Sequence, residues 1–537
     1  MRKLALFPRG LTSMMPRRLP IALVAALLTA VTMVAAAEPM SPTQPVSLTP
    51  PSPTQTILPP PASGNDLPDL GSPAAAYLSK AQEYQLGAMV AHELRDQSAL
   101  IEDPEVDEYI NGIGQRLASQ SAMGGEDFHY FTIKDQTINA FAVSGGFVFI
   151  NGGLVLATSS ESQLAGVMAH ETAHITQHHI ARMIADQSKQ SLTTVAALIG
   201  AIVLGALGGG GQATEGAIAA AQGMAIQHEI NFTRDNEWEA DRVGIGYLAS
   251  AGFDPSGMGS MFETMTRHMG LTETYIPAML IDHPMDSDRV AEQRSRAAQF
   301  PPWRGKDSES YALIRERVRI LTATGDVDMA VHYAQKIANG EDTLGNRYAE
   351  ALALMNSNRA GEAVKILAPL AQQHEGLTLL YAALGQAQAK AGHPDAALAT
   401  FKRGSVLFPR NVPLTVRYAE TLMAVNRPAE AHNMLLDLFN NVPPTPDQIR
   451  LTALAASAAG DPGDAYYYMG EYQLANGDLI LAAQQLTLAL ASPNISQIQR
   501  QRYRARLDEV HEFLASTRKR QLTDNTNDQG GRRGGGR

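Results

Sequence analysis

The sequence predicts an α+β domain in the first part of the chain and an all-α array of paired helices in the second part. Residues 131–150 alternate in polarity, contain β-branched and aromatic side chains, and lie ahead of a stretch with helical periodicity. From about residue 305 onward, polar turns recur every 33 or 34 residues. A chain of 537 residues is also too long for a single domain.

The N-terminus predicts export from the cytoplasm. Arg17 and Arg18 precede an apolar run, and three alanines at its end form a small-residue cleavage site before Glu38. We therefore expect residues 1–37 to be a signal peptide; a retained anchor helix is the alternative. Its removal would change the formal net charge from −11 to −16, which argues against nucleic acid or anionic lipid as the main partner. The absence of cysteine excludes lipidation and disulfides.

Composition sets the remaining boundaries. Residues 38–74 are rich in Pro, Ser and Thr, which predicts a disordered linker. The tail at 517–537 is polar with Gly and Arg at its end, and a disordered tail is the simpler interpretation than an RNA-binding segment. Between these segments we expect the first domain at 75–304 and the array at 305–516.

The alternating stretch at 131–150 predicts a β-hairpin around a Ser-Gly-Gly turn. An exposed edge of such a hairpin could take an extended peptide as an added strand, held through its main chain. The alternative is that Phe141, Phe147 and Phe149 belong only to the core. Both interpretations are compatible, because alternate side chains of a strand face opposite sides.

The most informative residues are His170, Glu171 and His174, on a predicted helix with a polar start at 159–162. The two histidines stand at i and i+4, so both imidazoles project from one face and can bind the same metal ion. Glu171 places a carboxylate where it can deprotonate a metal-bound water. The pattern predicts a zinc site used for hydrolysis, since a structural zinc site would have no use for Glu171.

The residues that follow exclude one class of third ligand. The metzincin pattern requires Gly and His where this chain has Gln177 and Ile180. His178 and His179 could bind the metal, but a solvated helix end is the simpler interpretation, because imidazole suits the negative end of the helix dipole.

A better third ligand lies on a second predicted helix, at 231–241. Glu237 and Asp241 are also at i and i+4, so Glu237 could bind the metal while Asp241 accepts a hydrogen bond from a ligand histidine. Alone, this pair is typical of a charged helix face. Combined with the first helix, it completes a zinc site with one open coordination position.

The segment between the two helices is unusually apolar. Residues 192–207 are almost wholly apolar, four glycines interrupt the run at 208–211, and it resumes at 217–225. The first run is short for a membrane span, so the segment predicts a buried helical hairpin or, alternatively, an interfacial one that gives peripheral membrane contact through 192–225. Either hairpin could flank the zinc site.

These features together resemble the M48-type zinc metallopeptidases. The resemblance extends to Asn139-Ala140-Phe141-Ala142, to Gly145–Leu154, and to His283-Pro284 followed by Arg289. It implies a zincin-type α+β fold with one Zn²⁺ ion per subunit. It also implies substrate binding along Asn139 to Ala142 and catalytic roles for His283 and Arg289.

His283 precedes a proline, which disfavours helix at this position and predicts an extended or turned segment. Three interpretations stay open. The imidazole could hydrogen-bond the oxyanion, with Arg289 adding positive charge. It could instead occupy the fourth zinc position, displace the water and keep the enzyme latent. It could also be a surface histidine in a turn.

The second half of the chain repeats with a constant pattern. Polar turns 33 or 34 residues apart are each followed five positions later by alanine. The turn residues are Gly325, Asn358, Gly392, Asn426 and Gly460, and a further turn lies at Gly477. This pattern resembles the tetratricopeptide repeat, most clearly at 380–409. Stacked helix pairs leave a concave surface, which predicts a protein-docking groove; a structural spacer is the alternative.

The combination of export signal, M48-like domain and tetratricopeptide array is similar to a family of periplasmic proteases of Gram-negative bacteria that act on outer-membrane β-barrel proteins. It implies a periplasmic enzyme for quality control and assembly, unfolded or misfolded outer-membrane proteins as substrates, and the β-barrel assembly machinery as a partner of the repeats. The residues themselves predict only an exported zinc endopeptidase with a docking array. The alternative is a chaperone or adaptor with an idle or structural zinc site, against which Glu171 argues.

Overall fold

The structure is a computed structural model of the chain. It describes residues 80–121, 123, 128–186, 234–271, 279–280, 283, 287–325 and 327–531. The expected signal peptide, the Pro-rich linker and the apolar segment at 192–225 lie outside these residues. Within the described part, no helix is both long enough and apolar enough to cross a membrane.

A small mixed sheet lies at the centre of the first domain. Its strands are β1 (His129–Ile133), β2 (Ala140–Val143) and β3 (Phe147–Asn151), in the order β1-β3-β2. Strands β2 and β3 are antiparallel and form the predicted hairpin, whereas β1 pairs with β3 in parallel. Gly145 and Gly146 in the turn have φ of 85° and 90°, a left-handed conformation that glycine adopts without steric cost.

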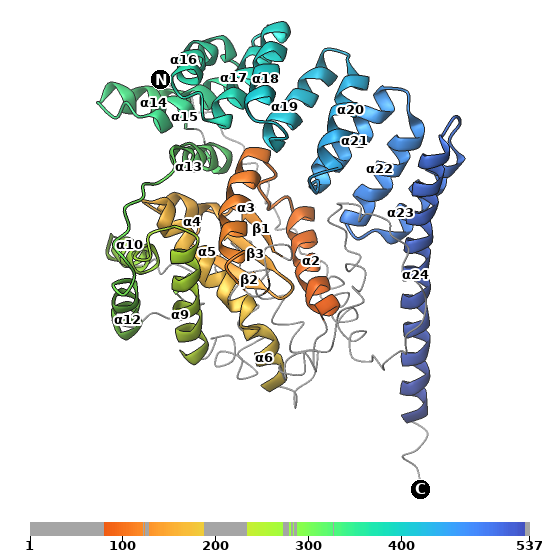
Figure 1. Cartoon of the computed structure of the whole chain (residues 1–537), viewed down its shortest axis with the longest axis horizontal. Coiled ribbons are helices and arrows are strands. Elements are labelled where there is room, and N and C mark those ends of the chain that lie inside the picture. The colour runs from red at the N-terminus through yellow and green to blue at the C-terminus, as the bar shows by residue number, and fades with distance from the viewer. Residues whose placement is uncertain are drawn as a thin grey trace, which may run out of the picture.

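Helices cover both faces of this sheet (Figure 1). The first domain contains α2 (Lys80–Asp96), α3 (Pro104–Ala118), α4 (Gly152–Ala157), α5 (Glu161–Thr176), α6 (His179–Asp186), α9 (Arg234–Ser250), α10 (Gly257–Leu271) and α12 (Ser287–Ala297). The alternation along β2 divides its side chains, because Phe141 and Val143 pack in the cluster with α2 while Ala140 and Ala142 face the main core. Phe141, Phe147 and Phe149 are buried, as the core interpretation expects.

The all-α part follows as an array of helices. Its members are α13 (Glu309–Thr322), α14 (Met329–Ala338), α15 (Leu344–Asn356), α16 (Ala360–Gln373), α17 (Thr378–Lys390), α18 (Pro394–Leu407), α19 (Val412–Ala424), α20 (Pro428–Phe439), α21 (Pro446–Ala458), α22 (Pro462–Ala475), α23 (Leu479–Ala491) and α24 (Gln497–Gly531). All six repeat-turn residues have positive φ, between 58° and 93°. Glycine and asparagine recur in the sequence because these residues tolerate the left-handed backbone conformation that follows the end of a helix.

Close packing explains the small residues of the repeat. A Cβ atom on Gly385 would lie 2.4 Å from the Phe401 ring, so α17 and α18 can approach only because position 385 has no side chain. The repeat alanines at 330, 363, 397, 431 and 482 are buried, while the one at 465 is half-buried. An α+β domain followed by a tetratricopeptide-type solenoid confirms the predicted fold class.

The C-terminal helix α24 extends into the segment 517–537, for which the composition predicts a tail. Helix α24 continues to Gly531 and projects beyond the array (Figure 1). The physical reason is that no proline interrupts 497–531, so a helix started against α23 can extend until the glycines at 530 and 531.

The array curves around the first domain, and one apolar core runs across the junction between them (Figure 1). Ile110 of α3 and Leu164 of α5 belong to the same buried cluster as Ile314 of α13 and Leu380 of α17. The first domain is thus packed against the inner side of the repeats.

Candidate metal centre

Helices α5 and α9 bring the predicted site residues together in the interior. Helix α5 begins as predicted at a polar cap, where the Ser160 hydroxyl accepts a hydrogen bond from the amide of Gln163 at 3.2 Å. It presents His170, Glu171 and His174, and all three are 1 % exposed. The surrounding helices exclude water, which strengthens every electrostatic contact among these side chains.

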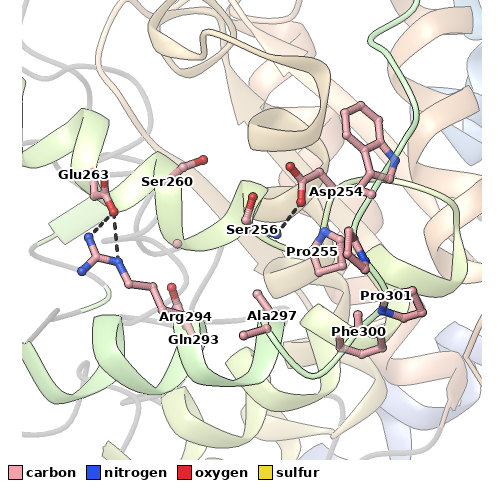
Figure 2. A pocket seen from close by; sticks show the side chains of 14 residues that line it. Asp254, Pro255, Ser256, Ser260, Glu263, Gln293, Arg294, Ala297, Phe300 and Pro301 are labelled. Carbon is pink, nitrogen blue, oxygen red and sulfur yellow. Dashed lines mark hydrogen bonds and ion pairs between the residues drawn. The ribbon is translucent and has the colours of Figure 1, made fainter.

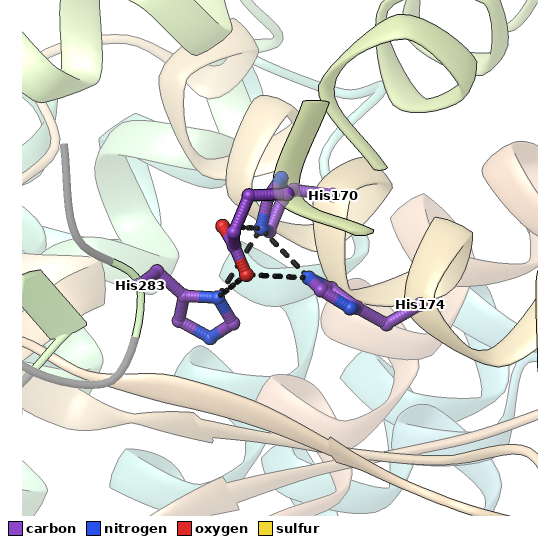
Figure 3. Close-up of side chains that lie close together, drawn as sticks. His170, His174 and His283 are labelled. Atoms are coloured by element: carbon purple, nitrogen blue, oxygen red, sulfur yellow. Dashed lines mark hydrogen bonds and ion pairs between the residues drawn. The ribbon is translucent and has the colours of Figure 1, made fainter. Parts of the chain in front are cut away.

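Four side chains converge on one point (Figure 3). His170 and His174 come from α5, Glu237 comes from α9, and His283 comes from the chain between α10 and α12. One nitrogen or oxygen of each lies within 4.8 Å of those of the other three. His283 is 2 % exposed, which contradicts the interpretation that it is a surface histidine.

The distances fit a tetrahedral zinc site. Nε2 of His170 lies 3.0 Å from Nε2 of His174 and 3.4 Å from Nδ1 of His283. Oε1 of Glu237 lies 2.9 Å from Nδ1 of His283 and 3.5 Å from Nε2 of His174. Zinc bonds of about 2.0 Å in a tetrahedron separate the ligand atoms by about 3.3 Å. The buried donor set of imidazoles and one carboxylate therefore has the spacing and chemistry that Zn²⁺ requires.

A carboxylate and an arginine support His170, the first candidate ligand. Oδ1 of Asp241 lies 3.0 Å from Nδ1 of His170, which is the contact predicted from the sequence. Arg289 binds Asp241 through Nε at 2.8 Å and Nη2 at 2.9 Å, and its Nη1 lies 2.9 Å from Oε2 of Glu237. The Arg289 guanidinium therefore orients two acidic groups of the centre, whereas the family resemblance implied that it adds positive charge beside the oxyanion.

A fourth histidine, His179, was not expected at the centre. It is fully buried at the start of α6, and its Nδ1 lies 2.8 Å from Nδ1 of His174. Its Nε2 lies 3.2 Å from Oε2 of Glu239. The expected solvated helix end is therefore wrong for His179, because α5 ends at Thr176 and the left-handed residue His178, with φ of 52°, redirects the chain before α6 begins at His179.

Neither Glu239 nor Arg289 could be assigned these contacts from spacing along one helix. Glu239 is two positions from Glu237 and reaches the site only through a residue of another helix. The adjacent His178 and His179 were the sequence signal for a further site residue. From their spacing alone, we could expect only metal binding or solvent exposure.

The pKa values of His170, His174 and Glu237 are shifted by burial and by the contacts these groups make with one another and with neighbouring charged side chains. Burial lowers the pKa of His170, but hydrogen bonds with Asp241 and Glu237 outweigh burial and raise the pKa to about 10. Burial raises the pKa of Glu237, yet the charge of His283 and the hydrogen bond from His170 bring it well below its ordinary value. Burial and the neighbouring His170 charge hold the pKa of His174 well below its ordinary value. A cation bound here takes the place of protons.

Glycines allow the helices of the site to approach closely. A Cβ on Gly244 of α9 would lie 3.0 Å from the carbonyl oxygen of Ala169 on α5. A Cβ on Gly166 of α5 would lie 2.7 Å from the backbone nitrogen of Met258 on α10. The small residues thus set the separation at which Glu237 can reach the histidines.

The segment that carries His283 is docked beside the hairpin. The amide of Met279 donates a hydrogen bond of 3.3 Å to the carbonyl oxygen of Ile138, and the amide of His283 donates to Met279 at 2.8 Å. Residue 138 immediately precedes the Asn139-Ala140-Phe141-Ala142 stretch, whose strand β2 lies at one side of the described sheet. The side chain of Asn139 is turned inward and accepts a hydrogen bond of 2.9 Å from the amide of Ala140.

A separate surface hollow of about 400 Å³ lies between α10 and α12 (Figure 2). Glu263 and Arg294 pair beside it, and Phe300 and Trp303 contribute its aromatic wall. None of the four clustered side chains lines this hollow. The metal centre is thus buried and distinct from it.

Comparison with known proteins agrees with this geometry. The profile of peptidase family M48 matches residues 104–297. The beta-barrel assembly-enhancing protease of Escherichia coli K12 is 31% identical over 453 residues, which are 84% of this chain and 92% of the relative. That of Yersinia pestis is 29% identical over 472 residues, 87% of this chain and 96% of the relative. The mitochondrial metalloendopeptidase OMA1 of Schizosaccharomyces pombe is 29% identical over 182 residues, 34% of this chain and 50% of the relative. The chain belongs to peptidase family M48, together with the beta-barrel assembly-enhancing proteases, and is a zinc metalloendopeptidase.

Proposed function

We propose that the chain is an exported zinc endopeptidase that degrades stalled or misfolded outer-membrane β-barrel proteins and promotes their assembly. The observation that carries the peptidase part is the buried cluster of His170, His174, Glu237 and His283 beside Glu171. We assign His170, His174 and Glu237 as the zinc ligands, because they come from two rigid helices and satisfy the spacing of a tetrahedral site.

The chemistry follows from the groups around this position. Zinc, when bound, polarises a carbonyl group and lowers the pKa of water. Glu171 follows the first ligand directly on α5 and is our candidate base, which accepts a proton from the attacking water and gives it to the leaving amine. Asp241 fixes the tautomer of His170, and Arg289 holds Asp241 and Glu237 in place. Arg289 is therefore proposed as a positioning residue.

The substrate class and location come from the relatives. The relatives that match most of the chain are named for enhancing β-barrel assembly. An apolar run and small-residue cleavage site at 1–37 support export, and together these points support the periplasm of a Gram-negative bacterium as the location. We propose that unfolded substrate adds as a strand beside Asn139 to Ala142.

We propose that His283 is a latch in the conformation described here. Its Nδ1 lies 2.9 Å from Oε1 of Glu237 and 3.4 Å from Nε2 of His170, close to the separation of two ligand atoms on one zinc ion. We assign it the fourth coordination position. The same segment donates a hydrogen bond to Ile138, beside the stretch proposed to bind substrate. Movement of this segment would release both the fourth coordination position and the strand.

The repeats are proposed to dock a protein partner, such as the β-barrel assembly machinery. Helices α13 and α19 contact α3 of the peptidase domain, so part of the inner surface is already occupied by the chain itself. We propose that the docking surface lies on the remaining repeats. We keep 75–304 and 305–516 as the proposed domain assignment.

Replacement of Glu171 by Gln tests the catalytic assignment. The variant should retain one zinc per chain and lose about 10²- to 10⁴-fold in the rate of cleavage of an unfolded outer-membrane protein. Zinc content is measured by atomic absorption and cleavage by gel analysis, with chelator-treated wild type as the reference. A parallel fall in zinc content and cleavage would contradict the assignment of Glu171 as the base.

A further inference from the structure

We propose that His179 and Glu239 form a positioning chain for His174, which holds the imidazole in the orientation and tautomer that metal binding requires. Two contacts carry the proposal. Nδ1 of His179 lies 2.8 Å from Nδ1 of His174, and Nε2 of His179 lies 3.2 Å from Oε2 of Glu239. The inference rests on the proposed role of His174 as a zinc ligand.

The proposed metal binding by His174 determines which ring nitrogens of His174 and His179 carry a hydrogen. Nε2 of His174 faces the other candidate ligand atoms, so a neutral ring that binds metal there carries its hydrogen on Nδ1. That N–H donates to Nδ1 of His179, which must then be the accepting nitrogen. The hydrogen of His179 is therefore on Nε2, where it donates to the Glu239 carboxylate. Each ring has one donor and one acceptor role.

The local backbone places His179 in this position. On an uninterrupted helix, a residue five positions after His174 would face away from it, at about 100° per residue. Here α5 ends at Thr176, and the left-handed His178 redirects the chain before α6 begins at His179. A non-glycine residue with positive φ is uncommon, and in this turn it produces a specific contact with a ligand histidine.

Glu239, at the outer end of the positioning chain, is also held in place. Arg182, one turn along α6, binds Oε2 of Glu239 through Nη1 at 2.8 Å and Asn236 through Nη2 at 3.2 Å. The Glu239 side chain is 24% exposed, so the chain runs from the buried centre toward the surface of the protein.

The arrangement parallels the support of the other histidine ligand. His170 contacts Asp241 directly, and Arg289 holds that carboxylate. His174 reaches the Glu239 carboxylate through the imidazole of His179, and Arg182 holds that carboxylate. Both imidazole ligands thus end in a carboxylate fixed by arginine, which is how outer partners raise the basicity of a ligand and limit its rotation.

Zinc affinity of the full mature chain tests the proposal. We compare wild type with His179→Phe, which keeps an aromatic ring without nitrogen, and His179→Gln, whose amide can accept from His174 and donate to Glu239. Zinc dissociation constants are measured by competition with a chromogenic chelator. His179→Phe should weaken zinc binding by about 10- to 100-fold, and His179→Gln should recover most of this loss. His178→Asn is the matched control, because it removes the adjacent imidazole and asparagine tolerates positive φ.

A second readout separates positioning from general damage to the fold. The d–d absorption spectrum of the Co²⁺-loaded chain should change in His179→Phe and return toward wild type in His179→Gln. Wild-type affinity in His179→Phe, or equal losses in the Phe and Gln variants, would overturn the proposal. If His179→Phe does not fold, Glu239→Leu replaces it, with Glu263→Leu as control, since both carboxylates pair with an arginine. Weaker zinc binding in Glu239→Leu, with wild-type binding in Glu263→Leu, supports the positioning chain. Equal zinc affinities of the two variants refute it.

The design also distinguishes failure of the proposed function. If His174→Ala binds zinc as tightly as wild type, the ligand assignment itself fails. If His174→Ala loses zinc while the His179 and Glu239 variants keep it, only the positioning chain fails.

Discussion

At the scale of single residues, the centre is defined by side chains that each contact more than one partner. Glu237 is within 3.5 Å of His170, His174, His283 and Arg289. Because all of them are buried, loss of any one leaves polar atoms without water to replace it. Substitutions here should therefore lower the stability of the fold as well as weaken metal binding.

His283→Ala tests whether that histidine is a latch. If the latched conformation outnumbers the open one by about ten to one, removing the imidazole should raise the cleavage rate about tenfold. Self-cleavage should rise with it. The measurement is the initial rate on an unfolded outer-membrane protein, with zinc content as the control. A slower enzyme with full zinc would indicate oxyanion stabilisation instead, and an unchanged rate would exclude both roles.

At the scale of elements, the separation of α5 and α9 decides whether the third ligand reaches the histidines. Gly244 faces the backbone of Ala169, and its absent side chain lets the helices meet. Gly246 lies on the same helix with no atom within 4 Å of an added Cβ. The two glycines thus offer a matched pair of substitutions.

Gly244→Ala should force α9 away from α5 and weaken zinc binding. The expected loss of stability is about 1–3 kcal/mol, typical of overpacking. Gly246→Ala should stabilise the helix by about 0.5–1 kcal/mol, because alanine loses less entropy in a helix, and it should leave zinc affinity unchanged. Chemical unfolding and chelator competition measure the two effects. Equal zinc affinity in both variants would show that the close approach is not needed for the site.

At the scale of the whole molecule, buried ion pairs join the repeats to the peptidase domain. Arg317 of α13 binds Asp103 through Nε and Nη2, both at 2.7 Å. Arg417 of α19 binds Glu105 through Nη2 at 2.7 Å. Deleting the array would remove both cations and uncover the apolar core that runs across the junction, which is destabilising. Loss of activity after deletion of the array would therefore not identify a docking role.

Asp103→Asn tests the contribution of this junction through its pH dependence. Burial raises the pKa of Asp103, but Arg317 and then Arg417 outweigh it and lower the pKa to about 2. The ordinary value in an unfolded chain is about 3.9, so the carboxylate stabilises the fold above that pH, by about 2–3 kcal/mol. This contribution is lost as the pH falls from about 4 toward 2.

The difference in unfolding free energy between wild type and Asp103→Asn should accordingly shrink over that pH interval. Urea unfolding between pH 5 and 2.5 measures it. Asp342→Asn is the control, because Asp342 makes the same two-point contact with Arg347 at the surface and should leave stability nearly unchanged. A difference that stays constant with pH would show that the ion pair does not stabilise the junction.

The sequence by itself determined the parts of this protein that depend on local spacing. Histidines at i and i+4 share a helix face, a Ser-Gly-Gly turn closes a hairpin, and glycine or asparagine every 33 or 34 residues ends a helix in a left-handed residue. These patterns predicted the fold class, the hairpin and the convergence of His170, His174 and Glu237. Local geometry is sufficient for the hairpin and for the shared helix face of His170 and His174, whereas the approach of Glu237 depends on the packing of α9 against α5.

Only the tertiary structure decided the contacts made between elements that are distant in sequence or follow an irregular turn. The left-handed His178 brought His179 into contact with His174, and packing of α12 directed Arg289 onto Asp241. Packing of α19 against α3 likewise joined residues 312 positions apart, Glu105 and Arg417. Periodicity specifies which face of a helix is apolar, but the packing of whole helices determines which polar groups on different elements meet in the interior.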